Sequence, residues 1–427
     1  MWIKEITISN YKSIREMNIK FQPGVNLLIG DNGVGKTSVL EAITVAFGDF
    51  MNGISGVSKK GISTTDVRID TKMISDVSQG IVHCTPITIK STFDTEEGIK
   101  QGEVTRRDET AKSKTRFIGK EVSDYANRKV NDLSEELPLF CYYSTSRLAP
   151  PKREDFGTAS KNKLNDRRCG YIGCMENNLD IKALKAWCLK MEMLAFQRQK
   201  PIAEYQAFKE IVANFMWKMN ELEEKPEVMY SRAFEDIVYI ENGETIPVNY
   251  LSAGYQSLLW MVMDMAFRMA NLNPEKLSLN QCEGIVLIDE IDMHLHPKWQ
   301  WKIVESLQEC FPKIQFILAT HSPIIISSCK NAALLEIDRD QTISELSDAY
   351  AYSVADVLAY RQGSSGIPDK LKDLSRKFEV EVNAKKYEAA REILRNMKRE
   401  YGAENSLVKK GRFTLRKESR QKVCRKN

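Results

Sequence analysis

The sequence predicts an α/β fold, and three stretches of the chain indicate it. Residues 25–29 form a short apolar run that reads as a buried strand, and a glycine-rich loop and an apolar helix at 38–47 follow it directly. Residues 284–288 and 316–319 are two further apolar runs, and each ends in polar residues. Buried strands that deliver polar side chains at their carboxyl ends are typical of α/β sheets that bind a ligand there.

The composition is that of an ordinary globular protein with room for two or three domains. The chain has 427 residues, 42% hydrophobic and 28% charged. It contains no apolar run of about 18 residues, so we expect no membrane span, and its N-terminal segment lacks the apolar core of a signal peptide. Nine scattered cysteines favour reduced thiols and a cytoplasmic location. Cys169 and Cys174 have neither C-x-x-C spacing nor a nearby histidine, which disfavours zinc.

Strands are predicted on both sides of the glycine-rich loop. Residues 2–8 alternate between polar and apolar and read as an edge strand, and residues 17–21 read as its neighbour. Further strand-like runs at 81–93, 102–107 and 115–118 complete a β-rich lobe. The glycine-rich loop is therefore expected to lie between a β-lobe and the buried strands of the sheet.

A helical insertion is predicted in the middle of the chain. Residues 139–143 read as an apolar strand. Residues 181–198 and 202–223 carry apolar residues at helical spacing, so they read as two helices. Residues 234–248 read as a hairpin around Gly243.

The last part of the chain is predicted to be helical with a basic tail. Apolar residues fall on one face of each of two helices after residue 365. Residues 409–427 hold nine Lys/Arg and one Glu, a net charge of +8, and subtracting this from the +4 of the whole chain leaves −4 for the rest. Such a tail is either simply solvated or a nucleic-acid-binding segment.

Residues 30–37 fit the phosphate-binding loop pattern G-x-x-x-x-G-K-[ST] without a mismatch. Backbone N–H groups of such a loop curl around phosphate oxygens, and the following helix adds the partial positive charge of its N-terminus. Lys36 is expected to reach the β- and γ-phosphates and Thr37 to ligate Mg²⁺. We therefore expect ATP and Mg²⁺ to bind at Gly30, Asp31, Asn32, Gly33, Val34, Gly35, Lys36, Thr37 and Ser38.

Two carboxylates follow the predicted strand at 284–288. Asp289 is expected to hold Mg²⁺ through water, and Glu290 to act as the general base that polarises the attacking water. A second glycine-containing loop, LSAGYQ at 251–256, precedes an apolar helix. A serine hydroxyl and a glycine amide at a helix N-terminus form another anion site, although a plain capped helix would have the same residues.

The motifs at 30–37, 251–256, 284–290, 292–297 (DMHLHP) and 319–323 (ATHSP) resemble, in their order, ABC-type ATPases of the SMC, RecF and overcoming-lysogenization-defect (OLD) branch. The resemblance implies a head-to-tail dimer with two ATP between the subunits, in which Ser252, Gly254 and Gln256 face the nucleotide of the other copy. It also implies that His321 contacts the γ-phosphate, so that Lys36, Glu290 and His321 form the catalytic set. His294 and His296 lack a third metal ligand, which favours packing at the dimer seam.

The resemblance does not assign a role to two residues, Arg147 and Lys12. The strand at 139–143 lacks the glutamine that ABC enzymes carry at its end, and the candidates to replace it are Arg147, which would steady phosphate charge, and a neighbouring hydroxyl. Arg147 is equally consistent with a structural role. Lys12 follows the first predicted strand and is a candidate nucleotide contact.

Within the branch, the chain is most similar to ATPase subunits of bacterial antiphage systems of the Septu type, which also occur beside retron reverse transcriptases. The resemblance implies that the ATPase regulates an HNH-type nuclease, with a reverse transcriptase and its RNA/DNA product as further partners and with higher oligomers open. The alternatives are a RecF-like DNA-repair ATPase and an ATP-gated nucleic-acid-binding scaffold. An OLD nuclease is disfavoured because the 106 residues after His321 show no clustered catalytic carboxylates.

The expected domain organisation follows from these assignments. A discontinuous ATPase head comprises residues 1–148 and 229–335, and the helical insertion comprises 149–228. A C-terminal helical region at 336–408 and the basic tail at 409–427 complete the chain.

Overall fold

The computed structural model describes residues 1–427 apart from 74–78, 148–165, 177–178, 275, 277, 347–349, 351, 362–366, 404 and 425–427. The contacts between residues divide the chain into two compact units, Met1–Ala351 and Tyr352–Asn427. The predicted boundary between head and insertion at 148/149 lies outside the described residues. None of the helices in the described part of the chain is both long and apolar enough to cross a membrane.

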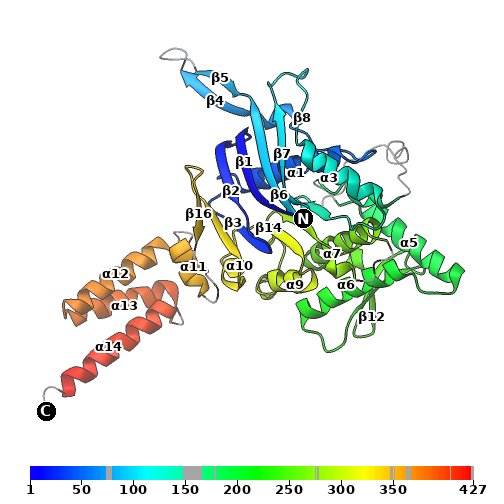
Figure 1. The fold of residues 1–427 in the computed structure, drawn as a ribbon. Coiled ribbons are helices and arrows are strands. Elements are labelled where there is room, and N and C mark those ends of the chain that lie inside the picture. The colour runs from blue at the N-terminus through cyan, green and yellow to red at the C-terminus, as the bar shows by residue number, and fades with distance from the viewer. Residues whose placement is uncertain are drawn as a thin grey trace. The chain divides into compact units, whose positions relative to one another are not determined.

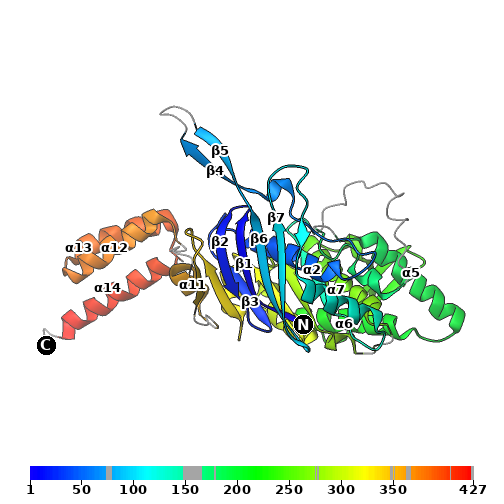
Figure 2. The ribbon, with the colours of Figure 1, turned by 45° about the horizontal axis from the view of Figure 1, so that its top comes forward.

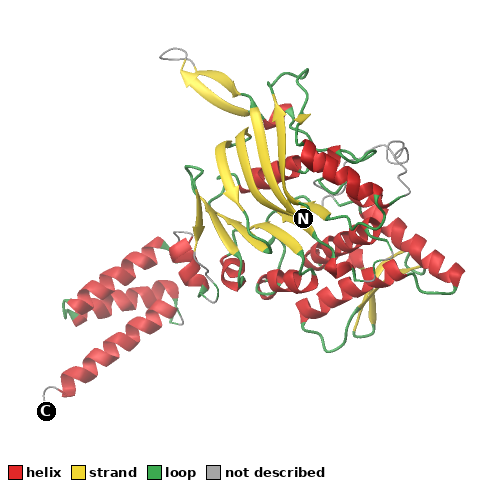
Figure 3. Ribbon diagram, in the orientation of Figure 1, coloured by secondary structure: helices red, strands yellow, loops and turns green. Residues whose placement is uncertain are grey.

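A six-stranded sheet forms the centre of the first unit (Figures 1 and 3). Four of its strands, at 25–29, 139–143, 284–288 and 314–319, are fully buried and pair in parallel, which is why they appear in the sequence as largely apolar runs. The order across the sheet is β16 (Ile343–Leu346), β15 (Ala333–Ile337), β3 (Val25–Ile29), β14 (Ile314–Ala319), β13 (Gly284–Ile288) and β9 (Leu139–Tyr143). The predicted α/β class is confirmed.

An antiparallel sheet forms the β-lobe beside it. Strands β1 and β6 alternate between buried and half-exposed residues, as expected for a sheet with one covered face. The order is β2 (Ile14–Lys20), β1 (Trp2–Tyr11), β6 (Ile87–Thr95), β7 (Gly98–Arg106) and β8 (Arg116–Phe117). Helix α1 (Lys36–Ala46) contacts strands of both sheets, so the helix behind the glycine-rich loop lies in the core.

The strand predicted at 81–93 is two strands. Pro86 interrupts it because proline lacks the N–H that a sheet ladder needs. The first part, β5 (Gln79–Cys84), pairs with β4 (Arg68–Met73) in a separate two-stranded ribbon that projects from the β-lobe in both views (Figures 1 and 2).

Helices also pack against the central sheet. The two predicted insertion helices are confirmed. Helix α6 packs on both α7 and α9. The elements of this region are α5 (Ile181–Arg198), α6 (Ala203–Asn220), β10 (Glu227–Ser231), β11 (Asp236–Glu241), β12 (Glu244–Pro247), η3 (Val248–Tyr250), α7 (Ala253–Leu272), η4 (Leu279–Gln281), α8 (Pro297–Gln300), α9 (Ile303–Cys310) and α10 (Pro323–Ser328). Shorter helices elsewhere in the unit are α2 (Gly48–Asn52), η1 (Thr64–Asp66), α3 (Lys120–Asn131) and η2 (Arg167–Tyr171).

The second unit consists of helices around a small core of its own. They are α11 (Val354–Arg361), α12 (Asp369–Asn383), α13 (Tyr387–Tyr401) and α14 (Ser406–Cys424), and the core consists of Leu371, Phe378, Ala390, Leu394, Met397, Val408 and Leu415.

Two features differ from the predicted organisation. Strands β15 and β16 extend to residue 346, where we predicted a helical region from 336, because β15 pairs with β3 at the centre of the sheet. The segment predicted as a tail from 409 is largely helical, because Val408 and Leu415 place one face of α14 in the core.

Candidate active site

The glycine-rich loop joins β3 to α1 in a conformation that glycine makes possible. Gly35 precedes α1 with φ 111°, and no side chain caps the first N–H groups of the helix. Gly30 has φ 141°, and a Cβ there would lie 2.3 Å from the carbonyl oxygen of Ile337 on β15. The loop therefore presents open N–H groups at a helix N-terminus, which is an arrangement that binds anions.

Lys36 occupies the centre of the loop. Its Nζ donates to the carbonyl oxygens of Gly30 at 2.8 Å and Asp31 at 2.9 Å. Burial lowers its pKa to about 8, and the nearby negative charges of Asp289 and Asp31 oppose this shift. The ammonium group is thus mostly charged at neutral pH, and a bound phosphate would stabilise that charge further.

Thr37 and Asp289 meet across 252 positions of sequence. The Thr37 hydroxyl donates to Oδ2 of Asp289 at 2.9 Å. Burial raises the pKa of Asp289, which shows a carboxylate held in a poorly solvated position. A hydroxyl and a carboxylate are hard oxygen ligands of the kind that Mg²⁺ prefers, so this pair fits a magnesium ion beside the loop.

Glu290 follows immediately and has the opposite environment. Its side chain is exposed, whereas Asp289 is buried. Its backbone is left-handed, with φ 44°, and its carbonyl oxygen accepts from the N–H of Met293 at 3.0 Å. The carboxylate can therefore reach water next to the position of Asp289.

His321 comes directly after β14, which neighbours both β3 and β13 in the sheet. Burial, followed by the charge of Lys36, lowers the pKa of the imidazole, so the neutral form dominates near pH 7. The preceding Thr320 donates its hydroxyl to Asp292 at 2.5 Å. This hydrogen bond connects the segment after β14 with the segment after β13.

The loop at 251–256 has its own internal support. The Ser252 hydroxyl caps α7 by accepting from the N–H of Tyr255 at 3.5 Å. Gln256 donates its amide to the carbonyls of Asn249 at 2.9 Å and Leu251 at 2.8 Å. Both N–H groups of Gln256 thus hold the loop itself, a role that the predicted nucleotide contact did not include.

Gly254 is required by a close approach to the DMHLHP segment. A Cβ at this position would lie 2.7 Å from the carbonyl oxygen of His294 and 3.3 Å from the Trp299 ring. His296 caps the short helix α8, with its Nδ1 accepting from the N–H of Lys298 at 3.3 Å. Both motifs therefore pack against each other within one chain.

The predicted residues form two groups. Lys36, Thr37 and Asp289 lie together; Glu290 is near enough that its charge acts on Lys36 and His321, and the charge of Lys36 also acts on His321. Within the described residues, no hydrogen bond or ion pair joins Ser252, Gly254 or Gln256 to the glycine-rich loop. Asn32, Gly33 and Val34 lie in the turn between β3 and α1, and Ser38 is the third residue of α1.

The two less settled residues are held by the protein itself. Lys12 pairs with Glu41 and, at 3.6 Å, with Asp66. Arg147 is 3% exposed and donates to backbone carbonyls beside the site.

One contact of the loop has no signal in the sequence. Arg339, in the turn between β15 and β16, forms an ion pair with Asp31 at 3.0 Å. Both side chains are largely exposed, and 308 positions separate them. No local pattern could have indicated a pairing over that distance.

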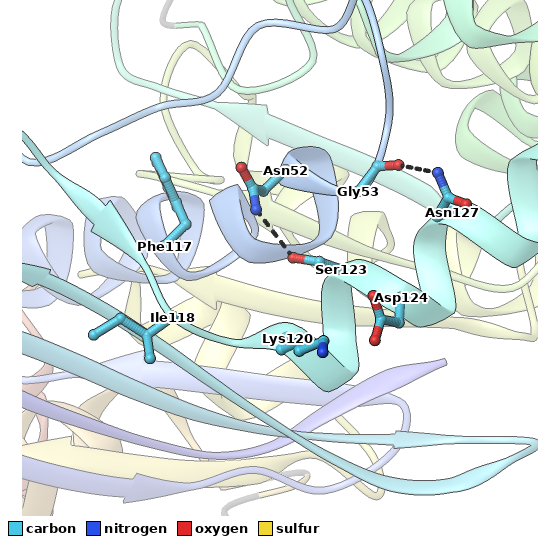
Figure 4. Close-up of a pocket in the computed structure, with 8 residues that line it drawn as sticks. All are labelled: Asn52, Gly53, Phe117, Ile118, Lys120, Ser123, Asp124 and Asn127. Atoms are coloured by element: carbon cyan, nitrogen blue, oxygen red, sulfur yellow. Dashed lines mark hydrogen bonds between the residues drawn. The ribbon is translucent and has the colours of Figure 1, made fainter.

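A pocket of about 380 Å³ lies elsewhere, between α2 and α3 in the β-lobe (Figure 4). Its amide groups are bonded within the pocket, from Asn52 to Ser123 at 3.3 Å and from Asn127 to the carbonyl of Gly53 at 3.1 Å. None of the motif residues lines it, so it is unrelated to the phosphate-binding loop.

Comparison with known proteins also indicates an ATPase. A family model described as an AAA domain matches residues 5–231, and one described as an AAA ATPase domain matches residues 180–326. The chain belongs to the AAA-domain ATPases.

Three relatives of this ATPase show which branch it resembles. The Retron Vc95 probable ATPase of Vibrio cholerae serotype O1 biovar El Tor is 26% identical over 91% of this chain and 83% of that protein. The Septu protein PtuA of Bacillus thuringiensis is 25% identical over 84% of this chain and 81% of that protein. The DNA replication and repair protein RecF of Streptococcus equi subsp. zooepidemicus (strain MGCS10565) is 49% identical over 43 residues, 10% of this chain and 12% of that protein. The predicted resemblance to ABC-type ATPases of this branch, and to Septu and retron ATPases, is confirmed.

Proposed function

We propose that this ATPase binds and hydrolyses ATP with Mg²⁺ as an ABC-type subunit of an antiviral defence system. The observation that carries the catalytic part is the hydrogen bond between Thr37 and Asp289. It joins the phosphate-binding loop to the carboxylate strand, and Glu290 follows with an exposed carboxylate.

Each side chain has a distinct task in this proposal. The N–H groups of α1 and the Lys36 ammonium bind the β- and γ-phosphates. Thr37 and Asp289 hold Mg²⁺, which neutralises charge on the phosphates when bound. Glu290 accepts the proton of the attacking water, and the neutral His321 imidazole contacts the γ-phosphate.

A second copy of the chain completes the site. Ser252 and the N-terminus of α7 form an anion-binding loop that, among the described residues, makes no hydrogen bond to the glycine-rich loop of its own chain. In a head-to-tail dimer, Ser252 and Gly254 of one copy would face the ATP held by the other. Two ATP would then be enclosed between two copies.

The defence role rests on the relatives named as retron and Septu proteins. By analogy, the ATPase regulates an HNH-type nuclease, and a reverse transcriptase with its RNA/DNA product belongs to the same assembly in the retron case. Cytoplasmic location is part of the same proposal.

The charge distribution supports a nucleic-acid partner. Residues 352–427 hold twenty Lys/Arg and ten Asp/Glu, a net charge of +10, and subtracting this from +4 leaves −6 for residues 1–351. On α14, Lys409, Lys410 and Phe413 are exposed. Lysines supply phosphate contacts and an exposed ring supplies a stacking surface for bases.

The dimer is tested with Glu290→Gln, which should bind ATP but accumulate as a closed dimer because hydrolysis no longer opens it. Light scattering with size-exclusion chromatography would show a doubled mass with ATP and Mg²⁺. The matched control Glu290→Gln with Lys36→Met should stay at the mass seen without nucleotide. A Glu290→Gln protein whose mass does not change at saturating ATP contradicts the enclosed-ATP dimer.

The nucleic-acid contact is tested without removing the packed face of α14. Lys409→Gln with Lys410→Gln should weaken binding to a labelled single-stranded DNA and reduce the slope of log affinity against log salt by about 1–2. Lys398→Gln with Arg399→Gln on α13 is the charge-matched control. Equal losses in both variants would indicate a general charge effect and no contact at α14.

A RecF-like repair role is the second candidate, because a short segment is 49% identical to RecF. A RecF-like protein needs no nuclease partner. Co-purification of an HNH protein encoded beside this chain would favour the defence role.

A further inference from the structure

Arg147 is a buried cation whose hydrogen-bond acceptors are neutral. It follows β9 and is 3% exposed. Among the described residues it has no carboxylate within ion-pair distance. A buried charge without an ion pair is expensive unless its donors are satisfied in good geometry, so its position calls for an explanation.

The guanidinium group bonds to three separate elements. Nε donates to the hydroxyl of Ser257 at 3.2 Å, in the second turn of α7. Nη1 donates to the carbonyl of Asp289 at 3.0 Å, and Nη2 to the carbonyl of Glu290 at 3.3 Å. A further bond from Nη1 to the carbonyl of Ser144, at 3.2 Å, fixes the turn that carries Arg147.

These hydrogen bonds hold the backbone of Glu290 in a strained, left-handed conformation. Glu290 has φ 44°, which a residue with a side chain adopts only when its surroundings impose it. The N–H of Met293 and Nη2 of Arg147 both donate to its carbonyl oxygen. The direction of the Glu290 side chain therefore depends on Arg147.

The same guanidinium reaches the helix that begins at the second loop. Ser252 caps α7, and Ser257 lies five residues further on the same rigid helix. A movement of α7 when its N-terminus engages a nucleotide would pass through Ser257 and Arg147 to the carbonyls of Asp289 and Glu290.

We propose that Arg147 is a positioning residue that couples the loop at 251–256 to Glu290 within one chain. The guanidinium makes no phosphate contact. It orients the Glu290 carboxylate when α7 engages the ATP of the partner copy, so water is activated only in the closed dimer. This inference rests on the proposed function.

The test uses the full chain and measures kcat separately from ATP affinity. Arg147→Met keeps the length of the side chain and removes all donors. It should lower kcat by about 100-fold, the loss typical of a misplaced catalytic group, while the Kd for ATP changes by less than about 3-fold. Arg147→Lys, which lacks the planar arrangement of donors, should have a kcat between those of Arg147→Met and the unaltered chain.

Ser257→Ala keeps the experiment informative if Arg147 variants fail to fold. Alanine suits a helix interior better than serine, so the variant should fold. It should lower kcat by about 3- to 10-fold with an unchanged Kd. Ser306→Ala, at a buried serine of α9 away from Arg147, is the matched control and should leave kcat within about 2-fold.

A double variant distinguishes a role of Arg147 in positioning Glu290 from a general structural role. In a Glu290→Gln background, Arg147→Met should change the residual turnover by less than about 2-fold, because the carboxylate it orients is already gone. The proposal is wrong if the two losses multiply, or if Arg147→Met weakens ATP binding as much as it lowers kcat. An unaltered chain that does not hydrolyse ATP would instead refute the proposed function.

Discussion

The glycine-rich loop at 30–37 and the loop at 251–256 both lead into a helix N-terminus, but they are supported differently. In the first, the functional groups bind one another: Lys36 donates to loop carbonyls and Thr37 to Asp289. In the second, Gln256 holds the loop and Ser252 remains exposed. The polar groups of the first loop are thus bonded to one another and to Asp289, whereas the second loop is held by Gln256 and leaves Ser252 exposed.

Buried carboxyls near the two loops also differ. On α2, which follows α1, the carboxyl of Asp49 is fully buried; its Oδ1 accepts from the N–H of Gly119 at 3.1 Å, and its Oδ2 has no hydrogen-bond partner among the described residues. On α7, the buried carboxylate of Asp264 accepts from Arg268 at 2.8 Å and from the Tyr143 hydroxyl at 2.9 Å. The carboxyl of Asp49 is therefore only half satisfied, whereas the carboxylate of Asp264 belongs to a satisfied ion pair.

The largest effect should come from Lys36→Met, which keeps the aliphatic chain and removes the charge. We expect the Kd for ATP to rise by at least about 100-fold, because charge-assisted contacts to phosphate are lost in a partly buried site. Isothermal titration would measure it. Lys90→Met, at an exposed lysine of β6, should leave the Kd within about 2-fold. A Lys36→Met protein with near-normal affinity would mean that the loop does not hold the phosphates.

A smaller effect is expected from Gly254→Ala, in the loop at 251–256. The methyl group would meet the His294 carbonyl at 2.7 Å, so α7 or the DMHLHP segment must shift. Turnover should fall by roughly 10-fold or more, while a single copy should bind ATP with unchanged Kd. Ala253→Ser, at the exposed neighbouring position, is the control. If Gly254→Ala weakens ATP binding by an isolated copy, the two loops do not act in different copies.

The smallest effect concerns pH and the buried carboxyl of Asp49. Burial raises the pKa of Asp49 to about 7, whereas an unfolded aspartate titrates near 3.9. Between these values the folded chain binds more protons than the unfolded chain. The free energy of unfolding should therefore fall as pH rises from about 4 to 7. Asp49→Asn should remove about 1–3 kcal/mol of this dependence.

Urea unfolding at pH 5 and pH 8 would measure the difference between the unaltered chain and Asp49→Asn. Subtracting the two pH profiles removes the contribution of all other groups. Parallel profiles would show that Asp49 is ionised in the fold at neutral pH.

The sequence predicted what is encoded locally. The glycine-rich loop, the strand before Asp289 and the strand before His321 are each contained in fewer than about ten consecutive residues, and four buried strands read as apolar runs because both of their faces are covered. Contacts between distant positions were not predictable. Arg147 bonds across 142 positions to Asp289, and Asp31 pairs with Arg339 across 308.

The strands at 333–346 were missed for a related reason. Strand β15 pairs with β3, which lies about 300 residues earlier, and β16 pairs with β15 in turn. The helix at 406–424 was missed because its composition is basic, while its packing depends on a few residues. There, Gly411 allows close contact, since a Cβ would meet Leu394 at 2.7 Å.

At Glu290, the left-handed backbone conformation makes the stability of the fold and the rate of ATP turnover favour different residues. Glycine adopts φ 44° without strain, so Glu290→Gly should relieve about 1 kcal/mol of conformational energy while removing the carboxylate. A laboratory selection for thermal resistance alone would therefore enrich a catalytically silent chain. Under the proposed defence role, selection for growth under viral attack would drive the same position back to glutamate.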